Sequence, residues 1–218
     1  MARLVLGNKW ARASKGRPWL HRILWRTEAM LISAGLRLCS LLPVDRASAM
    51  GRRLMTAIGP RLGKHNKFKE TLRIAFPEKS PKELERLVVA IWGNVGAVMA
   101  EYSHLKTICE RQADERLEIE TPSSTWEYRD GQRPAIFVAA HLSNFEICAG
   151  AIRKIAGPVT LVYKPLKNPW LDERLAKYRQ SMGCDLLSSE EGAGALLREL
   201  RAGRSIGLVM DQRHAGGK

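Results

Sequence analysis

Residues 135–157 read AIFVAAHLSNFEICAGAIRKIAG, and this stretch decides the fold. It begins with small and apolar residues that end abruptly at His141. From Phe145 onward the apolar residues recur at helical spacing, and Glu146 lies in the first turn of that pattern. The stretch therefore predicts a buried strand over 135–140, a short turn that carries a histidine, and then a helix.

Two interpretations of His141 and Glu146 are open. A carboxylate that accepts the imidazole N–H would fix the tautomer of His141 and leave its other nitrogen as a general base. Alternatively, Ser143 to Glu146 form a capping box, in which Ser143 caps the helix and Glu146 reaches back to the cap N–H. These residues alone favour the capping box. One histidine and one carboxylate are too few converging ligands to predict a metal site.

From about residue 115, strand and helix patterns alternate along the chain. The predicted strands cover 117–119, 135–140, 159–163, 185–187 and 205–210, and the predicted helices cover 145–155, 170–182 and 191–201. Repeated strand–helix units predict an α/β fold with a mostly parallel sheet flanked by helices. Because such sheets carry their chemistry at the carboxyl ends of the strands, the residues that follow each strand are candidates for a site.

Basic residues gather where the strand at 159–163 ends. Lys164 follows that strand directly, where it can meet a phosphate or a developing oxyanion. Asn168 precedes a proline, which is typical of a turn that starts a helix. Asp211 directly follows the last predicted strand, where it can hold a base or an arginine in place or simply cap a turn. A solvated basic helix face is the alternative for the cations. The predicted substrate-binding residues are Lys164, Asn168, Arg174, Arg179 and Asp211.

Residues 1–44 are predicted to form a basic arm followed by an apolar helix. Residues 1–26 carry seven cations and three tryptophans but no acidic residue, a combination that suits a membrane interface. Residues 24–43 are apolar but contain Glu28 and Arg37, whereas a spanning helix needs about 20 nearly uncharged residues. We therefore predict a helix that lies in the membrane surface or packs on the domain. A tilted span, an ordinary core helix and, for the arm, a disordered leader are the alternatives.

Residues 45–218 are predicted to form one domain, helical over 45–112 and α/β over 113–218. Within the helical part, Ser80 to Glu83 read SPKE, the signature of a capped helix start. The helix that follows buries one broad apolar face. Glu101 and His104, near its end, are expected to lie in a solvated helix terminus.

The net charge of +14 favours an anionic partner, such as a phosphorylated substrate, an acidic protein or an anionic membrane. The basic residues are spread over helices without a recognition helix or an aromatic RNA-binding motif, which argues against nucleic acid. The four cysteines lie far apart and form no C-x-x-C pair. They predict reduced thiols rather than disulfides or a zinc site.

Three motifs, taken in order, resemble one family. HLSNFE at 141–146, VYKPLKNPWLD at 162–172 and MDQ at 210–212 are similar in order and spacing to the bacterial lipid A biosynthesis acyltransferases. The resemblance spans roughly residues 24–213. It implies a glycerophosphate-acyltransferase-like fold and transfer of an acyl chain to a hydroxyl of a lipid A precursor, without a cofactor or metal.

The resemblance also implies roles and partners. In the family, the histidine and acidic residue of the H-x-x-x-x-D/E motif are the catalytic pair, and they fall on His141 as base and Glu146 as the residue that orients it. This reverses the preference for the capping box. The implied acyl donor is acyl carrier protein, and the implied acceptor is a phosphorylated lipid A precursor. The implied location is the cytoplasmic face of the bacterial inner membrane, whose anionic surface suits the basic chain.

The sequence departs from the family pattern in three places. Lys164 stands where the family commonly has arginine, so a point charge replaces a planar fork. Thr71 stands where the family usually has asparagine. The chain ends at Lys218, which suggests a C-terminally truncated member whose strand at 205–210 is left as an unpaired edge. The alternatives are another phospholipid or glycolipid O-acyltransferase, and an inactive truncated protein of the membrane surface.

Overall fold

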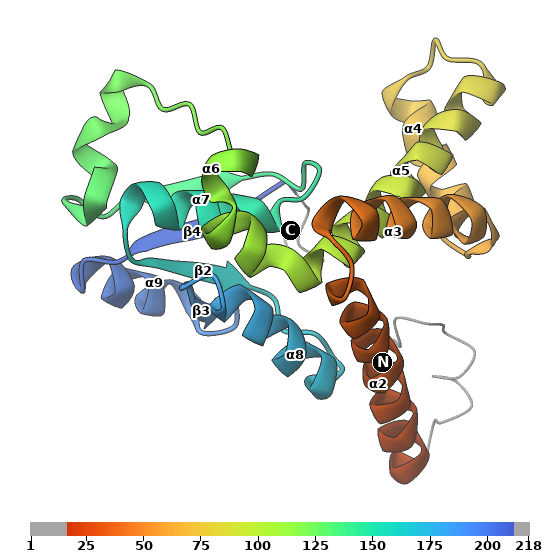
Figure 1. The fold of residues 1–218 in the computed structure, drawn as a ribbon, viewed down its shortest axis with the longest axis horizontal. Coiled ribbons are helices and arrows are strands. Elements are labelled where there is room, and N and C mark those ends of the chain that lie inside the picture. Colours follow the sequence, from red (N-terminus) through yellow and green to blue (C-terminus); the bar gives the residue numbers. More distant parts are fainter. Residues whose placement is uncertain (1–16, 212–218) are drawn as a thin grey trace. The chain divides into compact units, whose positions relative to one another are not determined.

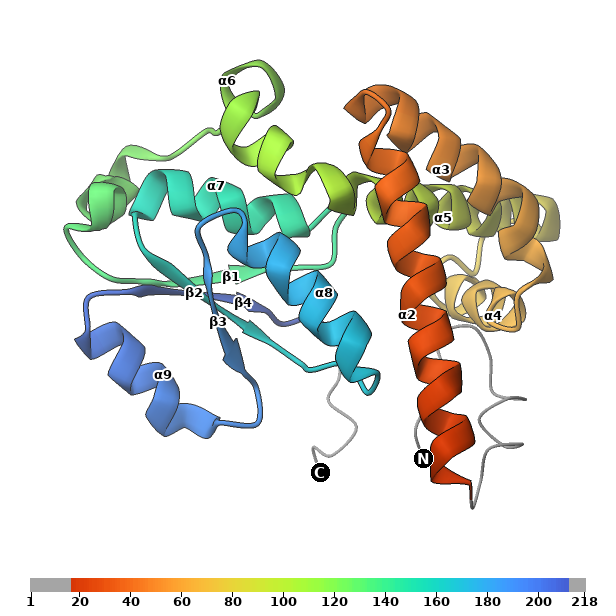
Figure 2. The ribbon, with the colours of Figure 1, turned by 60° about the horizontal axis from the view of Figure 1, so that its bottom comes forward.

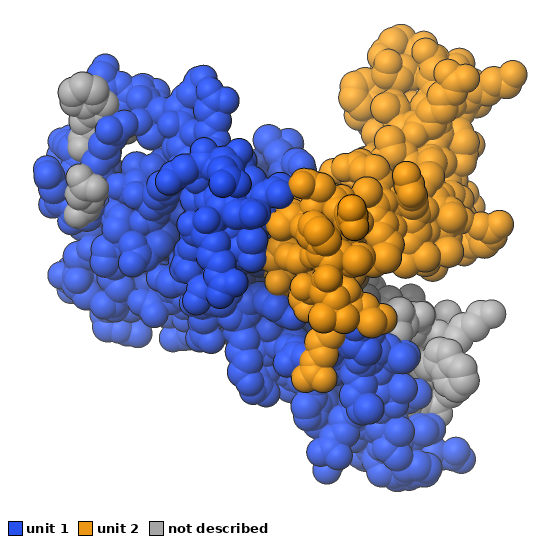
Figure 3. Space-filling model, viewed as in Figure 1, with its two compact units in different colours: residues 1–35, 105–218 blue, residues 36–104 orange. Residues whose placement is uncertain are grey.

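The computed structural model describes residues 17–211, except for the side chains at 124–126 and 130. The chain forms two compact units, coloured in Figure 3. Unit 1 comprises residues 1–35 and 105–218, and unit 2 comprises residues 36–104. The predicted boundaries after residues 44 and 112 stay predictions.

Unit 1 is built on a sheet of four parallel strands in the order β1-β4-β2-β3 (Figure 1). The strands are β1 (Ile136–Ala139), β2 (Val159–Tyr163), β3 (Asp185–Ser188) and β4 (Ser205–Val209). Helices α7 (Glu146–Ala156), α8 (Pro169–Gln180) and α9 (Gly192–Arg201) connect them in turn. Figures 1 and 2 show α7 and α9 on opposite faces of the sheet. The predicted α/β fold with a parallel sheet is confirmed.

β4 lies inside the sheet and not at its edge, so the expected unpaired edge at 205–210 is wrong. Ile206 pairs with Ile136 of β1 on one side and with Thr160 of β2 on the other, and it is completely buried. The edge strands are β1 and β3. Ile136 and Val138, which share one face of β1, are 53% and 64% exposed, so the strand predicted as buried has one open face.

The carboxylate of Glu199 holds α9 against the sheet. Its Oε2 atom accepts hydrogen bonds from Arg204 Nε and Thr160 Oγ1, each 2.6 Å long. The Arg204 bond, followed by the Thr160 bond, lowers the pKa of Glu199 to about 2. Residues 117–119, predicted as a strand, lie in irregular chain that follows the short helix α6 (Ala113–Arg116).

Helix α2 (Pro18–Ser40) begins in unit 1 and is attached there to the start of α8. The side-chain amide of Asn168 donates to the Trp25 carbonyl and to Glu28 Oε2, both at 2.9 Å. Asn168 and Glu28 are both almost fully buried. None of the described helices is both long and apolar enough to cross a membrane.

Unit 2 contains three helices, α3 (Val44–Ile58), α4 (His65–Ala75) and α5 (Pro81–Glu101). The capping box predicted at the start of α5 is confirmed, because Ser80 and Glu83 bond each other's backbone N–H groups. The solvated terminus expected at the end of α5 is wrong. His104 is buried and its Nε2 lies 3.1 Å from the Cys39 carbonyl oxygen, while Glu101 accepts a bond from Ser48.

Short helical segments complete the described chain. They are Gly59–Arg61 and Tyr102–His104 in unit 2, and Thr107–Arg111 and Ser123–Gly131 in unit 1. The segment Thr107–Arg111 has the wider π-helical winding. Cys109 in this segment packs against Gly150 of α7, where a Cβ would lie 2.4 Å from the cysteine sulfur.

Helices α3 and α5 pack closely because glycines meet at their contact. A Cβ built on Gly96 would lie 2.1 Å from the carbonyl oxygen of Gly51, and a Cβ on Gly51 would lie 2.3 Å from that of Gly96. Backbone atoms cannot move aside as a flexible side chain can. The pair therefore sets how closely the two helices approach.

We expect Gly96→Ala to destabilise the chain by about 1–3 kcal/mol, because the added methyl forces α3 and α5 apart. Urea unfolding followed by circular dichroism measures this change. Gly63→Ala is the control within unit 2, since no atom lies within 4 Å of a Cβ built there. Equal unfolding midpoints for the two variants would contradict the close packing.

Candidate functional site

The turn between β1 and α7 carries His141 in a conformation that the capping-box interpretation did not foresee. Ser143 has a φ of 47°, in the left-handed region that residues other than glycine rarely adopt. Helix α7 begins only at Glu146, after Phe145 in the cap position, and no side chain caps it. The capping box expected at Ser143 is therefore wrong, because a serine cap needs an extended backbone. Strained turns of this kind cluster at functional sites.

The imidazole of His141 is held by Asp211. Nδ1 of His141 lies 2.6 Å from Asp211 Oδ1, and the backbone N–H of His141 donates to Asp211 Oδ2 at 3.0 Å. The two residues follow β1 and β4, which are parallel neighbours, so the sheet brings them together across 70 positions of sequence. The side-chain bond from His141 is the main cause that lowers the pKa of Asp211.

This pairing determines the chemical character of the histidine. An ionised carboxylate at Nδ1 favours the tautomer that carries its proton there, which leaves Nε2 with a lone pair. Among residues 17–211, no hydrogen-bond partner is found for Nε2. The ring of Phe145 packs edge-on against the imidazole at a centroid distance of 4.5 Å. The arrangement is that of an oriented, accessible base.

Glu146 is bound by Arg179 in a buried ion pair. Arg179 Nε donates to Glu146 Oε2 at 2.8 Å, and Arg179 Nη2 donates to Oε1 at 2.6 Å. Glu146 is only 3% exposed, and the guanidinium lies over the ring of Tyr163 at 5.8 Å. The pair ties the first turn of α7 to the last turn of α8. The predicted pairing of Glu146 with His141 stays a prediction.

The other predicted substrate-binding residues have different surroundings. Lys164 is exposed directly after β2. Arg174 is partly buried, and its Nε has no hydrogen-bond acceptor among the described residues. Asn168 accepts a bond from the Leu171 N–H, so the predicted turn that starts α8 is confirmed, but its amide is committed to α2. The substrate roles of these residues and of Arg179 stay predictions.

Two buried cysteines of unit 1, Cys109 and Cys184, offer no thiolate to this site. All four cysteines of the chain are free, and burial raises the pKa of Cys109 and of Cys184 to about 11. A thiol with so high a pKa is a poor nucleophile at neutral pH. In the described part of the chain, no group of three or more His, Cys, Asp or Glu residues is arranged to hold a metal ion.

Comparison with known protein families gives one match that covers most of the chain. The family is described as bacterial lipid A biosynthesis acyltransferase, and it matches residues 15–217. The matched range contains His141, Glu146 and Asp211, together with helix α2. Comparison with curated proteins gave no match.

We expect Arg179→Met to destabilise the chain by about 3 kcal/mol, because it leaves the buried carboxylate of Glu146 without its cation. Lys177→Met is the matched control on the same helix, since its ion pair with Glu173 is exposed and screened by solvent, so its loss should change the stability little. Chemical denaturation measures both. Similar losses in the two variants would show that the buried pair does not stabilise the fold.

Proposed function

The chain belongs to the bacterial lipid A biosynthesis acyltransferase family and is an acyltransferase of that pathway, and we propose that it transfers an acyl chain from acyl carrier protein to a hydroxyl of a phosphorylated lipid A precursor. The contact between His141 and Asp211 is the single observation that carries the proposed mechanism. It supplies an oriented base at the carboxyl edge of the sheet, where α/β folds place their substrates.

In the proposed reaction, Nε2 of His141 removes the proton from the acceptor hydroxyl. The hydroxyl oxygen attacks the thioester carbonyl, and an ester bond forms as the carbon–sulfur bond breaks. The thiolate of the carrier then receives the proton from the imidazolium, which restores the histidine. Asp211 stabilises the transient imidazolium through Nδ1, as a carboxylate partner does in related base-catalysed acyl transfers.

We assign different tasks to the two carboxylates around the histidine. Asp211 accepts at Nδ1, whereas Glu146, with Arg179, holds the start of α7 and with it the turn that carries His141. A direct contact of Glu146 with His141, as the motif predicts, is the alternative assignment. Lys164, exposed at the end of β2, is proposed to stabilise the oxyanion or a substrate phosphate.

The charge and surface of unit 1 support the proposed partners. The net charge of +14 attracts an acidic carrier protein, a phosphorylated acceptor and an anionic bilayer. Helix α2 exposes Trp19, Ile23, Met30 and Leu31, each by more than half. On a helix of 3.6 residues per turn these four lie within one third of the circumference, which makes one apolar face. We propose that this face lies in the cytoplasmic surface of the inner membrane.

We expect His141→Ala to lower acyl transfer at least a hundredfold, and Asp211→Asn at least tenfold, because each removes part of the general base. The assay follows transfer from acyl-acyl carrier protein to a tetra-acylated lipid A precursor. Glu173→Gln, which neutralises an exposed carboxylate on α8, is the control expected to keep full activity.

The same assay separates the alternatives. Unchanged activity in His141→Ala would disprove its role as the base. A larger loss in Glu146→Gln than in Asp211→Asn, with both variants folded, would favour a direct partnership of Glu146 and His141. Transfer to a phospholipid acceptor, and not to the lipid A precursor, would point to another O-acyltransferase.

We expect Met30→Gln to weaken binding to phosphatidylglycerol vesicles about tenfold, because burial of this side chain in the bilayer contributes roughly 1.5 kcal/mol. Vesicle flotation of the full chain measures the bound fraction. Leu197→Gln, at an exposed apolar residue of α9, is the matched control. Equal binding of both variants and wild type would exclude α2 as the membrane-binding face.

A further inference from the structure

One face of β1 is uncovered, although parallel sheets are almost always covered by helices on both faces. Glu199 of α9 bonds Thr160 of β2, so α9 covers the face of the sheet to which Thr160 belongs. Thr160 pairs with Ile206 of β4, and Ile206 pairs with Ile136, so Ile136 lies on this same face. Ile136 and Val138 are nevertheless both more than half exposed. Helix α9 therefore leaves β1 open to solvent on the face that it covers over β2.

Apolar side chains form a strip along this open face of β1 and β4. Val138 pairs with Leu208, and the N–H of Met210 donates to the Ala139 carbonyl at 3.1 Å, which continues the ladder by one residue beyond β4. Alternate residues of a strand share a face. The apolar strip therefore consists of Ile136, Val138, Leu208 and Met210. Leu208 is partly buried, and the other three are more than half exposed.

The apolar strip ends at the proposed base and its carboxylate partner. Met210 directly precedes Asp211, and Ala140, which ends the predicted strand, directly precedes His141. Neither 135–140 nor 205–210 contains a charged residue. From Ile136 to Ala140 the extended chain spans about 13 Å. The strip is thus an uncharged track that begins beside the contact of His141 with Asp211 and runs toward the amino ends of the strands.

The size and shape of the apolar strip favour a slender apolar ligand over a protein. A stable protein interface uses about 20–30 residues on each side, whereas the strip has four. Its two strands lie about 5 Å apart, a width that one extended hydrocarbon chain covers. With no charge in the strip, a phosphate or a carboxylate finds no partner there. Exposed apolar surface of this kind marks ligand-binding grooves.

We propose that the apolar strip binds the acyl chain of the thioester donor. This inference rests on the proposed acyl transfer. The thioester carbonyl lies beside His141, and the chain extends along β1 and β4 toward Ile136. A precursor with several acyl chains does not fit a strip that is wide enough for one, which favours the donor over the acceptor. Met210 then contacts a donor chain of any length, whereas only a long chain reaches Ile136.

Binding of acyl-pantetheine thioesters to the full chain, without acceptor, tests the strip. Octanoyl and hexadecanoyl pantetheine are titrated calorimetrically below the concentrations at which they form micelles. We expect Ile136→Gln to weaken binding of the hexadecanoyl thioester roughly tenfold, because an amide replaces apolar surface that the chain would cover. The same variant is expected to bind the octanoyl thioester as wild type does, because the shorter chain ends before Ile136. Met210→Gln is expected to weaken binding of both thioesters.

The matched control is Ile74→Gln, at an exposed isoleucine of α4 in unit 2, which is expected to bind both thioesters as wild type does. Circular dichroism checks that all three variants are folded. Equal affinities of wild type and both strip variants for the hexadecanoyl thioester would overturn the proposal. A loss in Ile136→Gln that is the same for the two chain lengths would also overturn it.

Transfer assays separate this inference from the proposed function. We expect Ile136→Gln to lower kcat/KM about tenfold with hexadecanoyl-acyl carrier protein and to leave it unchanged with the octanoyl donor. Binding that depends on chain length, without transfer by wild type, would contradict the proposed function and still support the strip. A raised KM for the tetra-acylated acceptor, with the donor preference unchanged, would overturn the assignment to the donor. Reduced self-association of Ile136→Gln, with unchanged thioester binding, would assign the strip to a second copy and overturn the proposal.

Discussion

The insertion of β4 between β1 and β2 is the constraint on which the site depends. Parallel strands end at a common edge, so neighbouring strands bring the residues that follow them together. His141 follows β1 and Asp211 follows β4, and their side chains meet at 2.6 Å. Had β4 added to an outer edge beyond β3, Asp211 would lie several strand spacings from the histidine. The order of the strands thus determines which carboxylate acts on the imidazole.

A second constraint acts on the turn that carries the histidine and on the helix that follows it. The left-handed backbone at Ser143 is unfavourable for serine, so neighbouring contacts must hold it. The bidentate ion pair of Glu146 and Arg179 fixes the first turn of α7, three residues after Ser143. It joins the first turn of α7, which follows the turn with His141, to the last turn of α8. Asp211 thus contacts the imidazole of His141, and Glu146 contacts the guanidinium of Arg179.

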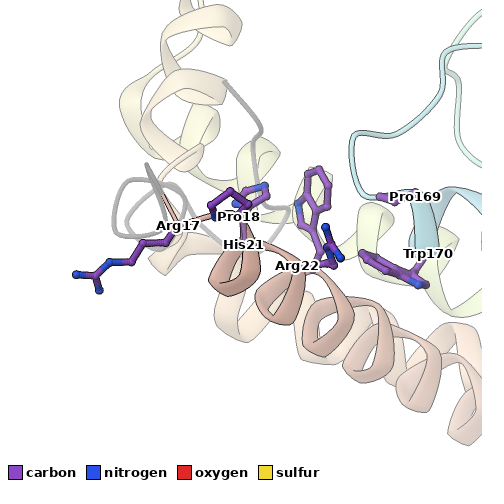
Figure 4. A pocket seen from close by; sticks show the side chains of 7 residues that line it. Arg17, Pro18, His21, Arg22, Pro169 and Trp170 are labelled. Atoms are coloured by element: carbon purple, nitrogen blue, oxygen red, sulfur yellow. The ribbon is translucent and has the colours of Figure 1, made fainter.

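Helix α2 has three regions with different surroundings: a buried side, an exposed apolar side and its first turns. Its buried side is attached to α8 by Asn168, which bonds both the Trp25 carbonyl and the Glu28 carboxylate. Its apolar side is exposed around Met30 and Leu31. Its first turns contribute Arg22 to a cavity that they share with α8 (Figure 4). The membrane interface expected for the tryptophans suits Trp19, which is exposed, whereas Trp25 lines the cavity, and Trp10 lies outside the described residues.

The sequence by itself determined the local units: the strand–turn–helix around His141, the capped start of α5 at Ser80, and the alternation that makes the sheet parallel. These depend on periodicity and on residues three or four positions apart, which a single chain displays directly. Only the tertiary structure decided that β4 is central, that Asp211 reaches His141 and that Glu146 is paired with Arg179. The physical reason is that these contacts join residues far apart in the sequence, 70 positions for His141 with Asp211 and 33 positions for Glu146 with Arg179. No local pattern encodes which of the many charged residues will meet.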